Sequence, residues 1–337
     1  MVNLPPLTAA HALSAWRFQA AVVIPLIVVA AVYLWGVARV ARRHPARPWP
    51  VFRTTLFLAG LVTIAVALLS FIGVYDDTLF WIHMIQHLML IMVAPALLVA
   101  GRPLILTMHA ARNPVHTIVK RMLRSRPVTV LTCPMVTIPL YAGTVVGTHL
   151  TSFMNVVITN PAAETGEILL YLIVGYLYFL PSVGDEPIRW RLSAPAKMVA
   201  VLLIMPIDTF TGLTLLTTAH EPWPAYAAQH RTWGPSPITD VHWGGAIMWV
   251  GGDVIMIVLI LVSLFRWLFG TARSTKRLRW IERARTATFN QSGGAATRPS
   301  PGRDIDEDDA QLAAYNAWLA QFSSRADPAP PPDSVMK

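Results

Sequence analysis

The chain has 337 residues, of which 54% are hydrophobic and only 13% charged, and its mean hydropathy is +0.50. Charged residues make up about a quarter of an ordinary soluble domain, so the composition excludes a soluble globular protein and indicates an integral membrane protein. The formal net charge of +9 then reflects membrane topology and contact with anionic lipid, and we expect no nucleic-acid partner.

Seven apolar segments approach the roughly 20 residues that a 30 Å hydrocarbon core requires. They lie at about residues 19–40, 54–73, 79–100, 128–149, 166–182, 196–218 and 243–268. The apolar runs are continuous rather than alternating, which predicts helices and not a β-barrel. We expect no cleavable leader, because the N-terminus lacks a basic region and the first segment is too long. The predicted fold class is all-α, a polytopic membrane protein with seven transmembrane helices.

Lysine and arginine gather in alternate loops. One side of the membrane carries Arg42, Arg43, Arg47, Arg53, Arg102, Arg112, Lys120, Arg121, Arg124, Arg126, Arg189, Arg191, Lys197, Arg273, Lys276, Arg277 and Arg279. The opposite loops contain only Arg17 and Arg231. The positive-inside rule therefore predicts that the N-terminus lies outside and the C-terminus in the cytoplasm.

The chain divides into a membrane domain, residues 1–270, and a cytoplasmic tail, residues 271–337. The tail begins with the basic stretch Thr271–Arg285 and continues with the linker Asn290–Gly302, which is rich in glycine, serine and proline. Next, Asp304–Phe322 has the pattern of a short amphipathic helix with acidic residues at its start. We expect this helix to dock either on the protein's own basic loops or on a partner.

The first candidate functional residues, His83 and His87, lie in the third apolar segment. Residues four apart share one face of a helix, and imidazole is the commonest metal ligand in proteins. Gln86 lies on the same stripe. A histidine pair within the bilayer is costly unless water, a metal or polar partners satisfy it. The spacing predicts a metal site, and the alternative is a pair bonded to backbone groups or to each other.

Topology places seven of the ten histidines on the outer side. His149 ends the fourth segment and His242 opens the seventh, so packed helices could bring both to His83 and His87. Further ligand types on the same side are the thioethers of Met84 and Met154 and the carboxylates of Asp76, Asp77, Glu164, Glu167 and Asp240. Imidazole and thioether without thiolate favour copper over structural zinc in an oxidising compartment. The alternative is that the methionines fill the core and the carboxylates are solvated.

Two acids lie deep in the membrane, Asp208 in the sixth segment and Asp253 in the seventh. An intramembrane carboxylate is a functional candidate by default. The two could form a polar lock between the helices or line a proton or ion path. Small-residue pairs, Gly244–Gly245 and Gly251–Gly252, predict close helix approach on the seventh segment. No soluble-enzyme motif is present, since Met84 occupies the glutamate position of the zinc-protease pattern, and we expect no catalytic activity.

Three stretches of the chain form recognisable motifs: FWIHMIQHLMLIMVAPALLVAGRPL (Phe80–Leu104), HLTSFMN (His149–Asn155) and DVHWGGAIMWVGGD (Asp240–Asp253). They resemble motifs of the CtaG family of cytochrome c oxidase (caa-type) assembly factors. The resemblance covers the second to the seventh segment, and the family's seven helices agree with the count above. The chain departs from the family pattern in two places. Val241 follows Asp240, where many members have Asp-Gln. Glu164 and Glu167 stand where further histidines are expected.

The resemblance implies a multi-pass protein of the bacterial plasma membrane with a role in maturing a haem-copper oxidase, around delivery or insertion of copper. The sequence thus predicts a membrane assembly factor that binds copper at the extracytoplasmic face and works on oxidase subunits within the lipid bilayer. His83, His87 and His149 are the expected ligands, with His242 or Met84 next. The rivals are a copper or proton-coupled transporter that uses Asp208 and Asp253, and a scaffold that grips oxidase subunits through its helices and tail.

Overall fold

The computed structural model describes residues 4–112, 114–228, 231–269 and 316. The chain divides into the units Met1–Leu264 and Phe265–Lys337. The basic stretch, the linker and the amphipathic helix predicted for the tail lie outside the described residues. The functional description therefore concerns the first unit.

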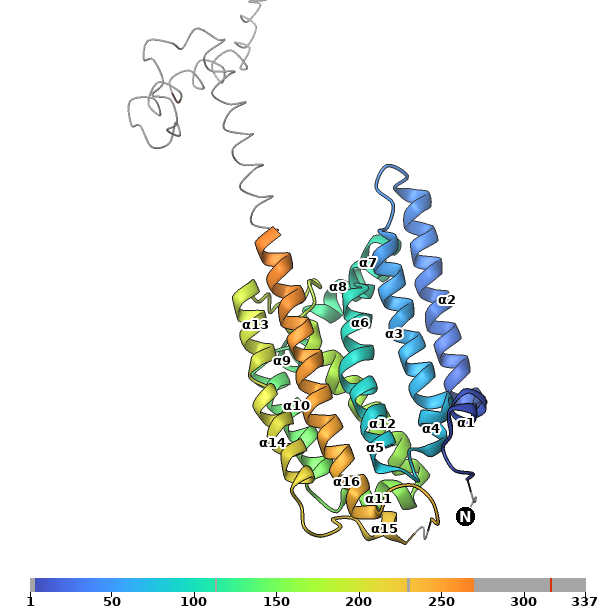
Figure 1. The fold of residues 1–337 in the computed structure, drawn as a ribbon. Coiled ribbons are helices and arrows are strands. Elements are labelled where there is room, and N and C mark those ends of the chain that lie inside the picture. The colour runs from blue at the N-terminus through green and yellow to red at the C-terminus, as the bar shows by residue number, and fades with distance from the viewer. Residues whose placement is uncertain (1–3, 113, 229–230, 270–315, 317–337) are drawn as a thin grey trace, which may run out of the picture. The chain divides into compact units, whose positions relative to one another are not determined.

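Every regular element in the described part of the chain is a helix (Figure 1). The elements are α1 (Ala9–Ser14), α2 (Ala20–Arg43), α3 (Val51–Leu69), α4 (Phe71–Tyr75), α5 (Phe80–Leu88), η1 (Met89–Val93), α6 (Ala94–Ala100), α7 (Pro103–Ala110), α8 (Val115–Leu123), α9 (Arg126–Leu131), α10 (Pro134–His149), α11 (Phe153–Thr159), α12 (Pro161–Ser182), α13 (Ala194–Leu202), α14 (Met205–Leu216), α15 (Pro224–Ala227), α16 (Pro237–Ala246) and η2 (Ile247–Gly251). The symbol η marks a π-helical turn. The all-α class is confirmed.

Six helical stretches among the described residues, some of them made of two or more consecutive helices, are long and apolar enough to cross a membrane. They are Ala20–Arg43, Val51–Tyr75, Phe80–Ala110, Pro161–Ser182, Ala194–Leu216 and Pro237–Phe269. The remaining predicted segment consists of two helices, α9 and the 16-residue α10. The helices separate at Thr132–Cys133, just before Pro134, because proline disfavours helical geometry in the residue before it. A multi-pass membrane protein is confirmed.

Proline and glycine together set the contact between α6 and α12. Pro95 has no N–H to donate to the carbonyl of Ile91, and the π-helical turn η1 immediately precedes α6. Gly175 of α12 packs on this carbonyl, since a Cβ at Gly175 would lie 2.2 Å from the Ile91 oxygen. Glu167 lies about two helical turns before Gly175. This close approach therefore sets how Glu167 is presented to α5.

A second close contact joins α14 to α16. A Cβ on Gly212 would lie 2.8 Å from the Gly245 oxygen, and one on Gly245 would lie 2.6 Å from the Gly212 oxygen. The neighbouring Gly244 makes room for the ring of Phe80, whose nearest atom would lie 2.4 Å from an added Cβ. The glycine pair in the seventh segment thus permits the close helix approach that the sequence predicts.

The main core contains large buried side chains from the third segment, α10 and α12, including Phe80, Met84, Tyr141, Tyr171 and Tyr178. Figure 1 shows α5 and the start of α16 at the same end of the bundle as α11 and α15. At this end the imidazoles meet the α12 carboxylate.

Candidate metal centre

Three potential ligands from two helices converge inside the bundle. His83 and His87 lie one turn apart on α5, and Glu167 comes from α12. Their ligand atoms all lie within 4.8 Å of one another, and each residue is at most 4% exposed. Glu167 Oε2 is 3.7 Å from His83 Nε2 and 3.5 Å from His87 Nε2. Two ligand atoms that share one ion at roughly 2.0–2.2 Å in tetrahedral geometry lie roughly 3.4 Å apart, so the spacing suits a single metal ion.

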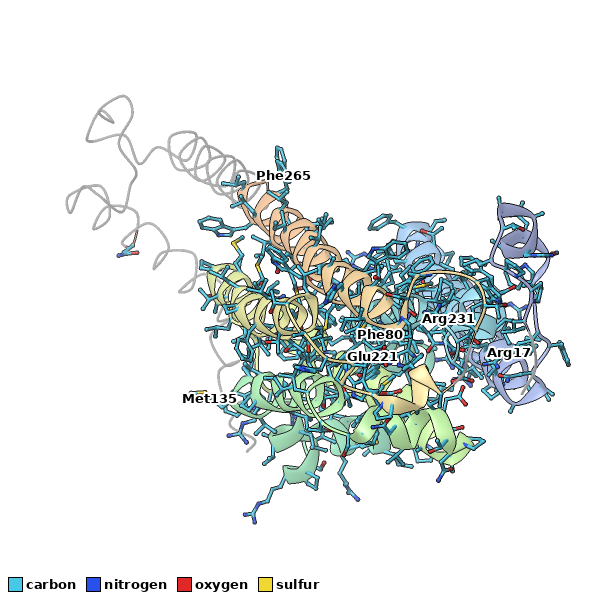
Figure 2. The ribbon with its side chains drawn as sticks, turned by 60° about the horizontal axis from the view of Figure 1, so that its bottom comes forward. Arg17, Phe80, Met135, Glu221, Arg231 and Phe265 are labelled. Carbon is cyan, nitrogen blue, oxygen red and sulfur yellow. The ribbon has the colours of Figure 1, made fainter. Side chains whose placement is uncertain are left out.

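The Asp240 carboxylate holds the start of α5 in place. Its oxygens accept hydrogen bonds from the backbone N–H groups of Phe80 and Trp81, both at 3.0 Å, and one of them pairs with Arg231 at 2.8 Å. A carboxylate at a helix N-terminus satisfies N–H groups that lack partners in the helix and complements its dipole. Figure 2 shows Phe80 and Arg231 close together in this region. Asp240, a candidate ligand in the sequence, therefore positions the helix that carries the histidines.

Hydrogen bonding assigns the tautomers of two imidazoles. The Val145 carbonyl can only accept, and it lies 2.8 Å from His149 Nδ1, so this nitrogen carries the hydrogen. In neutral His149 the other nitrogen, Nε2, is then an acceptor, and it lies 3.1 Å from His87 Nδ1. His87 Nδ1 must donate, which leaves the lone pair of His87 Nε2 directed at Glu167.

In this arrangement two hydrogen-bond acceptors, His87 Nε2 and Glu167 Oε2, face each other at a distance of 3.5 Å. Such a contact needs a proton or a cation between the atoms. Both ring nitrogens of His83, His87 Nε2 and Glu167 Oε1 are buried without a hydrogen-bond partner. Buried polar atoms are nearly always bonded, so four such atoms in one cluster fit a centre built to hold a cation. The donor set, two imidazoles and a carboxylate, suits a transition metal.

His149 lies where the sequence predicts, next to His87, but both of its ring nitrogens are engaged by protein atoms. It orients His87, as hydrogen-bond partners of metal-binding histidines commonly do. Thr148 Oγ1 lies 3.0 Å from His149 Nδ1 and 2.6 Å from the Tyr171 hydroxyl. The ring of Tyr171 meets that of His87 with centroids 4.3 Å apart.

Sequence reasoning did not identify Thr148 or Tyr171 as part of the site. A signal was available, since Glu167, Tyr171 and Gly175 recur every fourth residue on one face of α12. Such a stripe of acid, tyrosine and glycine in an apolar helix indicates a face directed into the bundle.

Other site residues that the sequence predicts form hydrogen bonds or ion pairs outside this cluster. His242 Nε2 lies 2.9 Å from the Thr218 carbonyl, and Glu164 lies 3.8 Å from Arg17. Asp253 accepts a hydrogen bond of 3.2 Å from Thr209. Gln86, on the histidine stripe, donates to Asp76 at 2.6 Å and to the Ala67 carbonyl at 3.1 Å. The structure thus brings together His83, His87, His149 and Glu167 from the predicted set.

Asp76 itself lies just outside the membrane-length stretch Val51–Tyr75. Burial, and next the charge of Asp77, raise the pKa of its carboxyl from 3.8 to about 8. The backbone carbonyl of the same residue accepts a hydrogen bond of 3.0 Å from the Tyr226 hydroxyl. Asp76 therefore connects the third segment to the loop that contains α15.

A cavity of about 20 Å³ lies beneath the imidazoles, enough for roughly one water molecule. It is lined by Met84, His87, Leu88, Ile91, Met92, Tyr141, Val145, His149, Tyr171, Asp208 and Met248. Met92 belongs to η1 and Met248 to η2, and π-helical turns often mark functional sites. Asp208 Oδ2 and the Tyr141 hydroxyl are buried without a hydrogen-bond partner. Asp208 and Met84, both singled out in the sequence, thus share one cavity with His87.

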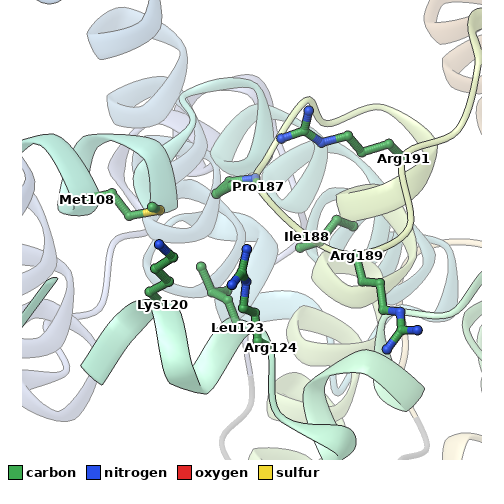
Figure 3. A pocket seen from close by; sticks show the side chains of 8 residues that line it. All are labelled: Met108, Lys120, Leu123, Arg124, Pro187, Ile188, Arg189 and Arg191. Atoms are coloured by element: carbon green, nitrogen blue, oxygen red, sulfur yellow. The ribbon is translucent and has the colours of Figure 1, made fainter. Parts of the chain in front are cut away.

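The loops that the positive-inside rule assigns to the cytoplasm form a basic pocket of about 470 Å³ (Figure 3). It is lined by Met108, Lys120, Leu123, Arg124, Pro187, Ile188, Arg189 and Arg191. Nearby, Glu186 accepts hydrogen bonds from the N–H groups of Leu104 and Ile105, at 3.1 and 3.0 Å, near the start of α7. Burial raises the pKa of Glu186 to about 7, against the opposing effect of these N–H groups. Sequence reasoning did not identify Glu186, an acid among basic loops.

The fold and the site together define a class: a multi-pass helical membrane protein with histidines and a carboxylate clustered inside the bundle. Residues 31–269, more than half of the chain, match the family described as cytochrome c oxidase caa3 assembly factor (Caa3_CtaG). The chain belongs to this family, as its motifs predict.

Uncharacterized mycobacterial proteins are similar to the chain. One from Mycobacterium bovis is 27% identical over 326 residues, which cover 94% of this chain and 46% of the relative. One from Mycobacterium leprae is 26% identical over 316 residues, which cover 91% of this chain and 44% of the relative. The chain thus spans less than half the length of these relatives. No solved structure matches it.

Proposed function

We propose that this protein binds copper at the extracytoplasmic side of the plasma membrane and hands it to a nascent haem-copper oxidase. The assembly role belongs to its family, and the copper site is our inference. One observation carries it: His83, His87 and Glu167 meet in a buried cluster in which three of the four ring nitrogens and one carboxylate oxygen lack a hydrogen-bond partner. The proposal includes seven membrane crossings, with α9 and α10 forming the fourth, and an external N-terminus.

The donor types favour copper. Imidazole suits copper and zinc alike, whereas thioethers select monovalent copper. The cavity beneath the imidazoles adds three thioethers, those of Met84, Met92 and Met248. Cys133 lies at the opposite end of α10 from His149, about 24 Å away along the helix, so no thiolate from this residue contributes.

The Glu167 carboxylate offsets the charge of a bound cation in a water-poor site, where an unpaired ion would be costly. Three protein ligands leave a coordination position open, as in metal centres that bind an incoming ligand. A donor from the oxidase subunit could occupy that position and draw the ion away. A carrier needs such a site, because it must release what it binds.

Copper binding to the purified protein tests the proposal. We expect the wild type to bind copper against a competing chelator, and His83→Ala/His87→Ala to lose this binding. His242→Ala is the matched control, because His242 is another outer histidine that bonds to a backbone carbonyl. Equal copper binding in the double variant and the wild type would refute the site.

A complementation assay separates delivery from a scaffold role. In a strain lacking the protein, His83→Ala/His87→Ala should fail to restore oxidase activity and oxidase copper, while His242→Ala restores both. Full restoration by the double variant would favour a scaffold that holds oxidase subunits through its helices and tail.

A transporter is the second candidate, because Asp208 faces the same cavity as His87 and His149. In this function the cation would pass from the imidazoles to Asp208 and onward through the membrane. Copper uptake into vesicles containing the protein, lost in Asp208→Asn, would support transport. Uptake no faster than in empty vesicles under any gradient would exclude it.

A further inference from the structure

A groove of about 570 Å³ runs between α2, α3 and α7, and its lining shares no residue with the candidate metal centre. Its apolar lining includes Val28, Val29 and Val32 of α2, Phe57 of α3 and Leu106 of α7. Only 11% of the most apolar stretch of α2 is buried within the protein, and Val32 is 62% exposed. In a membrane-spanning helix such side chains face lipid, so the groove opens to the bilayer.

One end of the groove is positively charged. Arg39 from α2 and Arg112, which follows α7, both line it. Arg39 Nε is buried without a hydrogen-bond partner, and its guanidinium lies 4.8 Å from the centre of the Trp35 ring. Arg43, at the same end of α2 as Arg39, donates to the Ala110 carbonyl at 2.8 Å. By the positive-inside rule this end lies at the cytoplasmic surface.

The dimensions match one leaflet of a bilayer. Val28 and Arg39 are eleven positions apart on α2, which corresponds to about 16 Å along a helix. Half of a 30 Å hydrocarbon core is about 15 Å. An apolar groove of this length that ends in two guanidinium groups is complementary to a lipid, whose acyl chain fits the apolar part and whose anionic headgroup fits the guanidinium groups.

The floor of the groove is held by direct contacts. The rings of Tyr33 and Phe57 stack with centroids 3.9 Å apart. The Tyr33 hydroxyl donates to the Gly101 carbonyl at 2.8 Å and accepts from Trp49 at 3.1 Å. A Cβ on Gly36 would lie 3.4 Å from Leu106, an ordinary van der Waals distance, so α2 packs against α7 at this position. The groove is therefore formed before any ligand enters it.

We propose that this groove binds one anionic phospholipid of the cytoplasmic leaflet. Its acyl chain lies along Val28, Val32 and Phe57, and Arg39 and Arg112 bind its phosphate. Guanidinium groups bind phosphate through paired hydrogen bonds, and the orphaned Arg39 Nε supplies one donor. A second copy of this chain is a poorer occupant, because two-fold pairing through this face would bring like-charged arginines to the same depth. The bound lipid joins the sparsely packed α2 to α3 and α7.

The test measures retained phospholipid by native mass spectrometry and the apparent Tm on adding phosphatidylglycerol or phosphatidylcholine. We expect the full-length wild type to retain an anionic lipid and to be stabilised more by phosphatidylglycerol. Arg39→Gln/Arg112→Gln should bind this lipid about tenfold more weakly, a loss of about 1.4 kcal/mol. The matched control is Arg124→Gln/Arg189→Gln, which removes the same charge from the basic pocket of Figure 3 and should behave as wild type.

A second pair of variants replaces only valines and therefore leaves the charge of the protein unchanged. Val32→Phe fills the groove and should reduce lipid retention, whereas Val62→Phe, at a comparably exposed position of α3 outside the groove lining, should not. Equal responses of the wild type to the two lipids would overturn the proposal, as would equal losses in the two arginine variants. Undiminished retention in Val32→Phe would overturn it too.

Discussion

At the scale of single residues, a chain of hydrogen bonds sets the chemistry of the centre. The Val145 carbonyl fixes the tautomer of His149, and His149 in turn fixes that of His87. The Nε2 lone pair of His87 therefore points at Glu167 without the need for a metal to direct it. Such pre-orientation lowers the entropic cost of binding an ion.

Replacing His149 should weaken copper binding without abolishing it. His149→Ala removes the acceptor for His87 Nδ1 and frees the ring to turn, so we expect affinity to fall roughly 10–100-fold. His149→Gln, which keeps an acceptor, should restore part of the loss. Chelator competition at several copper concentrations measures both variants. An unchanged affinity in His149→Ala would show that His149 does not orient His87.

Asp76 should make stability depend on pH. Its pKa is raised from 3.8 to about 8 by burial, so the folded state holds the proton more tightly than the unfolded state. The stabilisation is fully present below about pH 4 and is lost as pH rises towards 8. The apparent Tm of the wild type in detergent should therefore fall between about pH 4 and 8 and level off above about pH 8, and that of Asp76→Asn should fall less. Parallel curves for the two proteins would contradict the assignment.

At the scale of elements, helices approach most closely where proline or glycine permits it. Pro95 leaves the Ile91 carbonyl without its usual donor, and Gly175 presses α12 against that carbonyl. Glu167 and Tyr171 reach α5 from this same face of α12. The geometry of the candidate metal centre thus depends on a contact about two turns away.

Gly175→Ala should destabilise the protein and disturb the centre. The added methyl group would lie 2.2 Å from the Ile91 oxygen, and such overpacking typically costs about 1–3 kcal/mol. Gly166→Ala on the same helix is the control, because no atom lies within 4 Å of its added Cβ and alanine favours helix. We expect a lower apparent Tm and weaker copper binding only for Gly175→Ala. Equal stability of the two variants would contradict this role for the contact.

At the scale of the whole molecule, the distribution of charge predicts which loops face the cytoplasm. Glu221 lies in the loop after α14, and Arg189 lies in the loop between α12 and α13; both side chains are exposed. Arg189 belongs to the basic pocket, whereas Glu221 lies in the region of Phe80 and Arg231 (Figure 2).

Cysteine labelling tests this topology. In a Cys133→Ser background, a membrane-impermeant maleimide applied to intact cells should label Glu221→Cys and leave Arg189→Cys unlabelled until the membrane is broken. The reverse pattern would place the candidate metal centre on the cytoplasmic side. Oxidase assembly in the parent Cys133→Ser strain serves as the control for function.

Much of the fold follows from the sequence because the bilayer imposes length and composition on every crossing helix. The six long spans, the all-helical class and the family motifs could be predicted in this way. The fourth segment is not among the six membrane-length stretches, because the helix breaks before Pro134 and hydropathy does not reveal this break.

The sequence by itself determined that His83 and His87 share a helix face, since the spacing of four residues is local. Only the tertiary structure decided that Glu167 completes the cluster, that His149 orients His87, and that Asp240 and His242 bond elsewhere. The reason is physical: an i, i+4 relation is set by helix geometry within one segment. Contacts between segments depend instead on how Gly175, Gly212 and Gly245 let the helices approach and rotate against one another.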